Sequence, residues 1–353
     1  MSCNPTNYLT TDTTESHSSF NDFFCVVNNR STKSFELPPR NSMVLFVSST
    51  FTDTEQERNI LLEKILPKLF NVCNPLNLRV VLLDLRYGIR DENVEDHMIW
   101  IACEKEIFRC YRESGSLAFL SLQGDKYGFR PIPKYIDKEM FENRIQDSTY
   151  SEAANLSMAN EWYFLDENAD PPVYVLRTLT NTNKVTFWDN VCSQLRSLFR
   201  DMPFITNNSD LIIDRSITEY ETRKAMSLSS NSKYSRMYWL HRQFTGGVTE
   251  AHDPKHNYSD VNGLVLRKKF DDLINNMTSE LSHENRIHNF NLPIESYVNQ
   301  DDTGKAYLKE WEEVTYSKLR EQLDIVIENR KSWETNGCGF GKGCINGLVL
   351  QEF

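Results

Sequence analysis

The chain has 353 residues, of which 39% are hydrophobic and 25% charged, so it is long enough for one large globular domain or two ordinary ones. Its 50 acidic residues outnumber its 39 basic residues, which argues against a nucleic-acid backbone as the main partner. No apolar run approaches the ~20 residues that span a bilayer, and the first residues lack the pattern of a secretory signal. We therefore expect a cytoplasmic protein with no membrane partner, whose scattered cysteines are buried thiols.

The first 42 residues are rich in Ser, Thr and Asn and contain a single apolar island, FFCVVNN, before the proline-containing ELPPR. This composition is typical of a flexible segment. We expect residues 1–42 to form a flexible N-terminal lead.

From Met43 onward, short apolar runs alternate with longer amphipathic segments, which is the pattern of a βαβ series and a parallel sheet. The predicted strands are MVLFVSS, LRVVLLDLR, SLAFLSL and PVYVLRTL. A helix is expected after the first strand, with Thr52 or Asp53 as its cap, and Pro67 should kink or divide it. In the next helix, Cys103 and Cys110 share the apolar face, which favours core packing over metal binding. We expect an α/β domain over residues 43–200.

Beyond Asp201 the pattern weakens. We predict a helix at SITEYETRKAMSL, an aromatic strand at RMYWLHRQF, and long helices at LRKKFDDLINNMTSELSHE and AYLKEWEEVTYSKLREQLDIVIENRKSW. These segments indicate a mostly helical C-terminal extension over residues 201–333, which continues the α/β domain or packs on it. Residues 334–353 are expected to form a flexible tail.

Polar side chains follow three of the predicted strands, at the edge where an open parallel sheet binds its ligands. Hydroxyls, arginines and a glycine-containing loop at a helix N-terminus could hold an anion or a ribose. The candidate crevice residues are Ser48, Ser49, Thr50, Asp53, Arg86, Tyr87, Gly124, Tyr127, Gly128 and Arg130. The alternative is structural, because Ser and Thr after a strand are ordinary helix caps and Gly supplies unusual backbone angles. Asp84 is the better candidate for an interior partner, to Arg86 or Arg58.

Other chemistries find no support. The chain has no G-x-S-x-G, no H-E-x-x-H and no pair of C-x-x-C motifs, so we predict no metal site. Gly341 and Lys342 in the tail invite comparison with a P-loop, but Asn336 replaces its first glycine and Gly343 its magnesium-binding Ser or Thr. We predict no ATP site and no resident cofactor.

Four motifs together resemble a known family. The segments VSSTFTDTEQERNILLEKILPKL, LDLRYGIRDENVEDHM, ACEKEIFRC and GDKYGFRPIP look like the TIR-like domain at the N-terminus of NACHT and WD repeat domain-containing proteins. Similar modules precede the NACHT part of telomerase-associated proteins and nephrocystins. The resemblance is specific from Val44 to about Arg144 and continues as a pattern to about Trp333.

This resemblance implies a flavodoxin-like, TIR-related α/β domain from a signalling or scaffold ATPase of the STAND type. We expect a non-catalytic interaction module whose partners are other proteins or another copy of itself. Whether it also binds a small molecule is left open. The chain departs from the family because it stops before a valid P-loop and carries no repeat. It is expected to be a fragment, a truncated gene model or a stand-alone module.

The alternative that the resemblance implies is an enzyme, because some TIR relatives cleave the nicotinamide bond of NAD with a glutamate on the helix after the third strand. A carboxylate near the ribose stabilises oxocarbenium-like charge as that bond breaks. The corresponding helix is YIDKEMFENRI, so Glu139 or Glu142 is the catalytic candidate. The usual spacing between strand and glutamate is not reproduced. NAD is a cofactor only under this alternative.

Overall fold

The computed structural model describes residues 39–50, 52–85, 99–147, 153–180, 183–200, 202–205, 208–212, 215–229, 236–248, 253, 263–281 and 287–335. The predicted flexible lead and tail lie almost wholly outside these residues. Within them, no helix is both long and apolar enough to cross a membrane.

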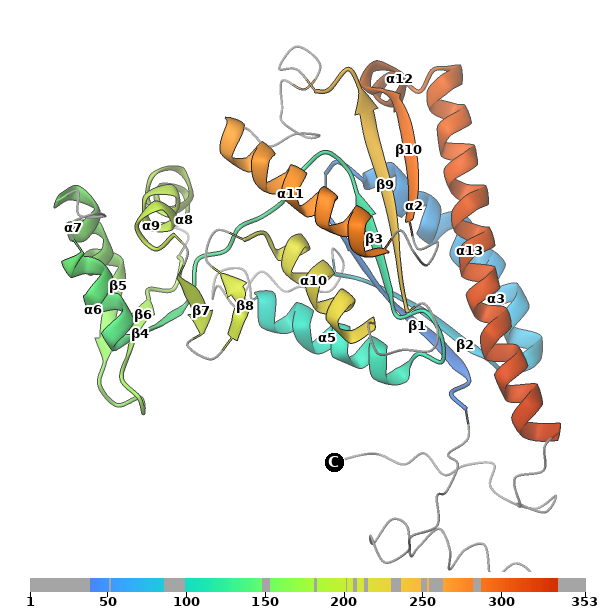
Figure 1. Cartoon of the computed structure of the whole chain (residues 1–353), viewed down its shortest axis with the longest axis horizontal. Helices are drawn as coiled ribbons and strands as arrows, with labels where there is room; N and C mark the ends of the chain where they lie inside the picture. Colours follow the sequence, from blue (N-terminus) through green and yellow to red (C-terminus); the bar gives the residue numbers. More distant parts are fainter. Residues whose placement is uncertain are drawn as a thin grey trace, which may run out of the picture.

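A five-stranded parallel sheet forms the centre of the molecule (Figure 1). Its strand order is β2–β1–β3–β9–β10, and every neighbouring pair is parallel. This is the flavodoxin-like order, so the predicted α/β fold class is confirmed. The strands are β1 (Ser42–Ser49), β2 (Arg79–Asp84), β3 (Phe119–Gln123), β9 (Met237–Thr245) and β10 (Ile287–Pro293).

The inner strand β1 is buried on both faces, as its continuous apolar run predicts. Its alternate residues enter two different cores. Val44 and Phe46 point into one, where Phe46 stacks on Phe119 of β3 with ring centroids 5.6 Å apart. Met43, Leu45 and Val47 belong to the other.

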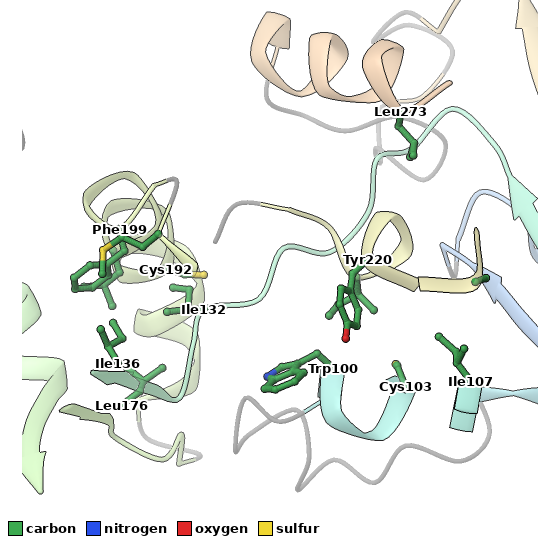
Figure 2. Close-up of a cluster of buried hydrophobic side chains, with 14 of the residues drawn as sticks. Trp100, Cys103, Ile107, Ile132, Ile136, Leu176, Cys192, Phe199, Tyr220 and Leu273 are labelled. Carbon is green, nitrogen blue, oxygen red and sulfur yellow. The ribbon is translucent and has the colours of Figure 1, made fainter. Parts of the chain in front are cut away.

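Helices α5 (Ile99–Glu113), α10 (Ile217–Ser229) and α11 (Gly263–Leu281) contribute to the Val44 side. Cys103 and Cys110 of α5 are buried there as free thiols, which confirms the expected core packing. Figure 2 shows Tyr220 of α10 above Trp100 and Cys103.

The opposite face is covered by the first helical run and by α13 (Asp302–Thr335), the longest helix of the described chain. The first run is divided into α2 (Glu55–Ile60), the π-helical η2 (Leu61–Ile65) and α3 (Leu66–Cys73), followed by the short 3-10 turn η3 (Asn74–Leu76). Pro67 lies in the first turn of α3, directly after the π-helical segment. This division agrees with the expectation that proline interrupts the helix.

Between β3 and α10 the chain forms a subdomain, residues 131–212, that we call the insert. Figure 1 shows it to one side of the sheet. The predicted fourth strand PVYVLRTL does form a strand, β6, but in a separate antiparallel sheet of order β4–β6–β5. Figure 2 shows Ile136, Leu176 and Phe199 packed together inside the insert. Its elements are β4 (Tyr135–Asp137), α6 (Lys138–Gln146), α7 (Ala153–Trp162), β5 (Tyr163–Asp166), β6 (Val173–Leu176), α8 (Lys184–Thr186), η5 (Phe187–Val191), α9 (Cys192–Leu198), β7 (Pro203–Ile205) and β8 (Asn208–Ile212).

The segment after residue 200 supplies the last two strands of the sheet. The predicted aromatic strand RMYWLHRQF is β9, which pairs with β3. Strand β10 was not predicted, because only Phe290 and Leu292 of its IHNFNLP run are fully buried apolar residues. Helix α12 (Ile294–Asn299) follows β10 and leads into α13.

Helix α13 should be part of the folded core. Trp311 is 2% exposed and packs in the cluster that contains Met43, Leu45 and Val47. Because Trp311→Ala leaves a large cavity there, we expect it to lower the free energy of unfolding by about 3–5 kcal/mol, measured by urea denaturation. Lys309→Ala is the control on the same helix: its side chain is 79% exposed, so a change within about 0.5 kcal/mol is expected. Equal effects of both substitutions would contradict this packing.

Candidate functional site at the carboxyl edge of the sheet

The structure gathers most of the predicted strand-end residues at one edge of the sheet. Ser48 and Ser49 end β1, Thr50 and Asp53 lie in the turn before α2, and Gly124, Tyr127 and Gly128 follow β3. Arg86 and Tyr87 lie outside the described residues. Whether this edge can hold a ligand depends on what its polar atoms already bind.

Arg58 of α2 is buried, and its guanidinium binds other groups of the chain. It forms an ion pair with Asp84 at the end of β2, and the two side chains are 1% and 4% exposed. Its Nε donates to the Ser49 hydroxyl, and its Nη2 donates to the Ser49 carbonyl oxygen at 3.0 Å. The expected interior pairing of Asp84 with Arg58 is therefore present, and it ties β1, β2 and α2 together.

Ser48 lies on the other side of β1, and it too binds a buried side chain of the fold. Its hydroxyl donates to Oε2 of Glu221 on α10 at 2.5 Å. Burial raises the pKa of Glu221, while hydrogen bonds from Ser48 and Cys103 and the charge of Arg58 oppose that rise. Ser48 thus serves as an internal partner for a buried carboxyl group.

The turn after β1 is closed around Asp53, which is fully buried. Its carboxylate accepts hydrogen bonds from the Thr50 hydroxyl and from the Lys126 backbone N–H, the latter at 3.1 Å. Burial raises the pKa of Asp53 to about 7, and the nearby Arg242 guanidinium only partly offsets this effect. Gly124 passes so close that a Cβ there would overlap the Asp53 carboxylate and the Arg242 guanidinium. The glycine is therefore needed for the close approach of backbone to side chain.

Arg242 of β9 is the central cation of the edge. Its Nη1 donates to the Asp53 carbonyl oxygen at 2.5 Å and lies 3.6 Å from Oε1 of Glu57. The guanidinium is flanked by the rings of Phe244 and Tyr297, whose centroids are 4.1 and 4.5 Å from Cζ. Burial by itself would lower the pKa of Arg242, but the surrounding phenols and carboxylates raise it above its usual value.

Two tyrosines from the C-terminal helices complete this cluster. Tyr297 of α12 and Tyr307 of α13 donate to the two oxygens of Glu57, at 2.7 and 2.6 Å. Both phenols are at most 5% exposed. The helices that follow β10 therefore cover the edge and occupy the acceptor atoms of α2.

Tyr127 and Gly128 lie at the next part of the edge. The Tyr127 hydroxyl donates to Oε2 of Glu219 on α10, and Arg223 donates to the other oxygen of that carboxylate at 2.7 Å. Gly128 has a φ of +103°, a conformation that favours glycine. Arg130 is half-buried, and its carbonyl oxygen accepts from Arg196 of α9 at 3.0 Å.

In the described part of this edge, carboxylates lie close to the buried Arg242. Asp53, Glu57 and Asp125 surround its guanidinium, and Asp125 also accepts from the Phe244 backbone N–H at 3.2 Å. In the part of the chain that the structure describes, no group of three or more His, Cys, Asp and Glu side chains is arranged to hold a metal ion. The arrangement is that of an internal polar network.

The two catalytic candidates lie elsewhere. Glu139 and Glu142 are on α6 of the insert, which Figure 1 places well apart from the carboxyl edge of the sheet. Glu139 is exposed, and Glu142 is half-buried and accepts from the Tyr174 hydroxyl at 3.5 Å. The structure therefore does not bring either glutamate together with Ser48 or Tyr127.

Sequence reasoning missed the partners that occupy the edge: Glu57, Glu219, Glu221, Arg242, Tyr297 and Tyr307. One signal was available, because Arg242 is a charge inside the otherwise apolar and aromatic RMYWLHRQF. A buried strand tolerates such a charge only when a partner is near.

The buried pair of Arg58 and Asp84 generates a stability prediction. Arg58→Met removes the cation that faces a buried carboxylate, so we expect the free energy of unfolding to fall by about 3–5 kcal/mol. The double variant Arg58→Met/Asp84→Leu should recover much of the loss, because both charges are then absent. Lys68→Met is the control: Lys68 pairs with Glu312 at 2.6 Å, but its side chain is 49% exposed, so at most about 1 kcal/mol is expected.

The raised pKa of Asp53 generates a pH prediction. Between about pH 4 and 7 the folded state holds a proton on Asp53 that the unfolded state has released, so this group makes the fold less stable as pH rises. Asp53→Asn abolishes this titration. We expect the stability of wild type relative to Asp53→Asn to fall by about 1.4 kcal/mol per pH unit across that window.

A second buried group should show the opposite sign. Burial lowers the pKa of His241 to about 4. The unfolded state therefore binds a proton between about pH 6.5 and 4 that the folded state does not, so the stability that neutral His241 contributes is lost as pH falls through this range. Chemical denaturation of wild type, Asp53→Asn and His241→Gln at several pH values separates the contribution of Asp53 from that of His241.

If the stability of wild type and of Asp53→Asn changed with pH in the same way, that result would contradict the burial of the Asp53 carboxyl group.

Comparison with known proteins relates part of the chain to very large proteins. The chain is 26% identical over 179 residues to human NACHT and WD repeat domain-containing protein 2. It is 36% identical over 105 residues to human NACHT domain- and WD repeat-containing protein 1. It is also 33% identical over 91 residues to Telomerase protein component 1 of Rattus norvegicus.

The matched regions cover 46%, 30% and 26% of this chain but only 10%, 7% and 3% of those relatives. No family model and no solved structure matches the chain. The chain is thus related, distantly and in part, to a region of NACHT and WD-repeat proteins.

Proposed function

We propose that this chain is a non-catalytic protein-interaction module of the TIR-like type. In this view it works as the regulatory region of a NACHT and WD-repeat signalling or scaffold protein. Its place would be the cytoplasm, where the buried thiols of Cys73, Cys103, Cys110 and Cys192 remain reduced. Its partners would be other proteins or further copies of itself.

The observation that carries the proposal is the closure of the carboxyl edge by the chain's own side chains. Flavodoxin-like folds bind their ligands at this edge, yet here Ser48, Ser49, Asp53 and Tyr127 each bind another side chain of the fold. A bound nucleotide would have to displace these buried hydrogen bonds and leave their partners unsatisfied. That exchange costs roughly 1–3 kcal/mol for each group.

The electrostatics of the edge support the same proposal. A dinucleotide brings a negative pyrophosphate, which folds of this class bind with free backbone N–H groups and cations. The described part of the edge instead offers the carboxyl groups of Asp53, Glu57 and Asp125, with Arg242 already flanked by two aromatic rings. Repulsion between carboxylates and phosphate would oppose binding, most strongly above about pH 7, where Asp53 is also ionised.

The position of α6 argues further against NAD cleavage. A glutamate that stabilises an oxocarbenium-like ribose must lie against the sugar. Glu139 and Glu142 lie on the insert, apart from the strand ends that would have to hold that sugar. The partial relation to NACHT and WD-repeat proteins is the second support for the proposed module.

Incubation of the purified chain with NAD tests the proposal against its alternative. We expect no nicotinamide release at high protein concentration, and no thermal stabilisation by NAD or ATP, because the edge is closed. A known NAD glycohydrolase serves as the positive control for the assay. Release that Glu139→Ala or Glu142→Ala abolishes would overturn the proposal and establish the enzyme.

A further inference from the structure

The antiparallel sheet of the insert has two unlike faces. Residues directly opposite each other in a sheet share a face. One face carries Tyr163 and Tyr174 and is covered by α6, because Phe141 lies 5.5 and 3.8 Å from their ring centroids. The other face carries the exposed side chains of Tyr135 and Phe164.

That second face presents a row of apolar side chains across all three strands. Val175 of β6 pairs with Tyr135 of β4 on one side and with Phe164 of β5 on the other. We call these three residues the outer row. Tyr135 is 45% exposed and Phe164 is 46% exposed, whereas Val175 between them is 9% exposed. Exposed aromatic side chains gathered on one face mark interaction surfaces more often than isolated exposed residues do.

The outer row has an acidic margin on one side. One step along the strands, Val173 pairs with Asp137 of β4 and with Asp166 of β5. Asp166 therefore lies on the same face as the outer row, on the side toward Val173. Asp137 ends β4 on that side, and its carboxylate accepts from the backbone N–H groups of Glu139 and Met140 at the start of α6.

The opposite margin is cationic. The ammonium of Lys134 lies 5.7 Å from the ring centroid of Tyr135, and the guanidinium of Arg177 lies 5.7 Å from that of Phe164. Lys134 precedes Tyr135 while Asp137 follows it, and Arg177 follows Val175 while Val173 precedes it. The cations and the carboxylates therefore lie on opposite sides of the outer row.

We propose that the outer row is a self-association surface, occupied by the outer row of a second copy of this chain. A two-fold axis along the row lays aromatic side chains on aromatic side chains. It also places the cationic margin of each copy on the acidic margin of the other, so the surface is complementary to itself. A two-fold axis across the row would instead oppose like charges. The inference rests on the proposed function, since it names the partner of an interaction module.

The size of the face sets the strength of the contact. Three short strands about 4.8 Å apart make a face only roughly 10–15 Å across. A face of that width has an area on the order of 100–200 Å², which is far less than the ~800 Å² per partner of a standard stable interface. The contact is therefore weak and reversible on its own, and it becomes strong when several copies are held together in one assembly.

Sedimentation velocity of the full chain over a wide concentration range tests this surface. We expect a monomer–dimer equilibrium whose dissociation constant rises at least about tenfold in Phe164→Ser, because an aromatic anchor is lost. The matched control is Phe108→Ser on α5, an aromatic residue that is 45% exposed and lies 4.8 Å below the ammonium of Lys224. It should leave the equilibrium unchanged.

A charge exchange tests the orientation without removing an apolar side chain. Arg177→Glu should weaken the dimer, since it sets an acid against the acidic margin, and Arg177→Glu/Asp166→Lys should restore it. A chain that stays monomeric at every concentration overturns the inference, as does a dimer that none of the face variants weakens. A monomer that releases no nicotinamide overturns self-association alone, whereas nicotinamide release overturns the proposed function whether or not the dimer forms.

Discussion

The burial of two guanidinium groups is the constraint on which the carboxyl edge of this protein depends. Arg58 is 1% exposed and Arg242 is 2% exposed, and a charge taken out of water is tolerated only when partners replace its hydration. Arg58 obtains them from β1 and β2, through Ser49 and Asp84. Arg242 obtains them from the turn before α2 and from Glu57. Each arginine therefore fixes strands and helices that are far apart in the sequence in one arrangement.

The same constraint determines which groups occupy the described part of the carboxyl edge. The flavodoxin-like order brings several strand ends and helix starts to one edge, where free N–H groups and polar side chains usually meet a ligand. Here those groups meet each other. Tyr297 of α12 and Tyr307 of α13 donate to both oxygens of Glu57, so the C-terminal helices cover this part of the edge. Helix α13 packs on the Met43 side of the sheet with the large buried Trp311, and this packing holds the tyrosines in place.

Much of the fold could be predicted from local patterns, because β1, β2, β3, β9 and most of the helices carry clear periodicities. The sheet to which each strand belongs could not be predicted from local patterns. The VYVL of β6 has the apolar character of a buried parallel strand, yet it pairs in the antiparallel sheet of the insert, since pairing is decided by segments far away in the chain. Strand β10 alternates buried and exposed residues, and the polar residues at its exposed positions kept it from being predicted as a strand. At the edge, the strand-end residues were found because topology places them there, while Glu57 and the two tyrosines were missed because nothing local distinguishes a partner from a solvated side chain.

The position of the insert in the chain separates stability from interaction. It lies in the crossover between β3 and β9, where α10 packs against α5, for example through the hydrogen bond from the Tyr111 hydroxyl to the Ala225 carbonyl oxygen at 2.8 Å. The insert adds no strand to the parallel sheet, and its aromatic side chains pack around Phe141. Its outer face can therefore change without disturbing Arg58, Arg242 or the strands that they fix. Such a surface can acquire a partner without a change in the core, because connections between elements accept new function more readily than buried strands do.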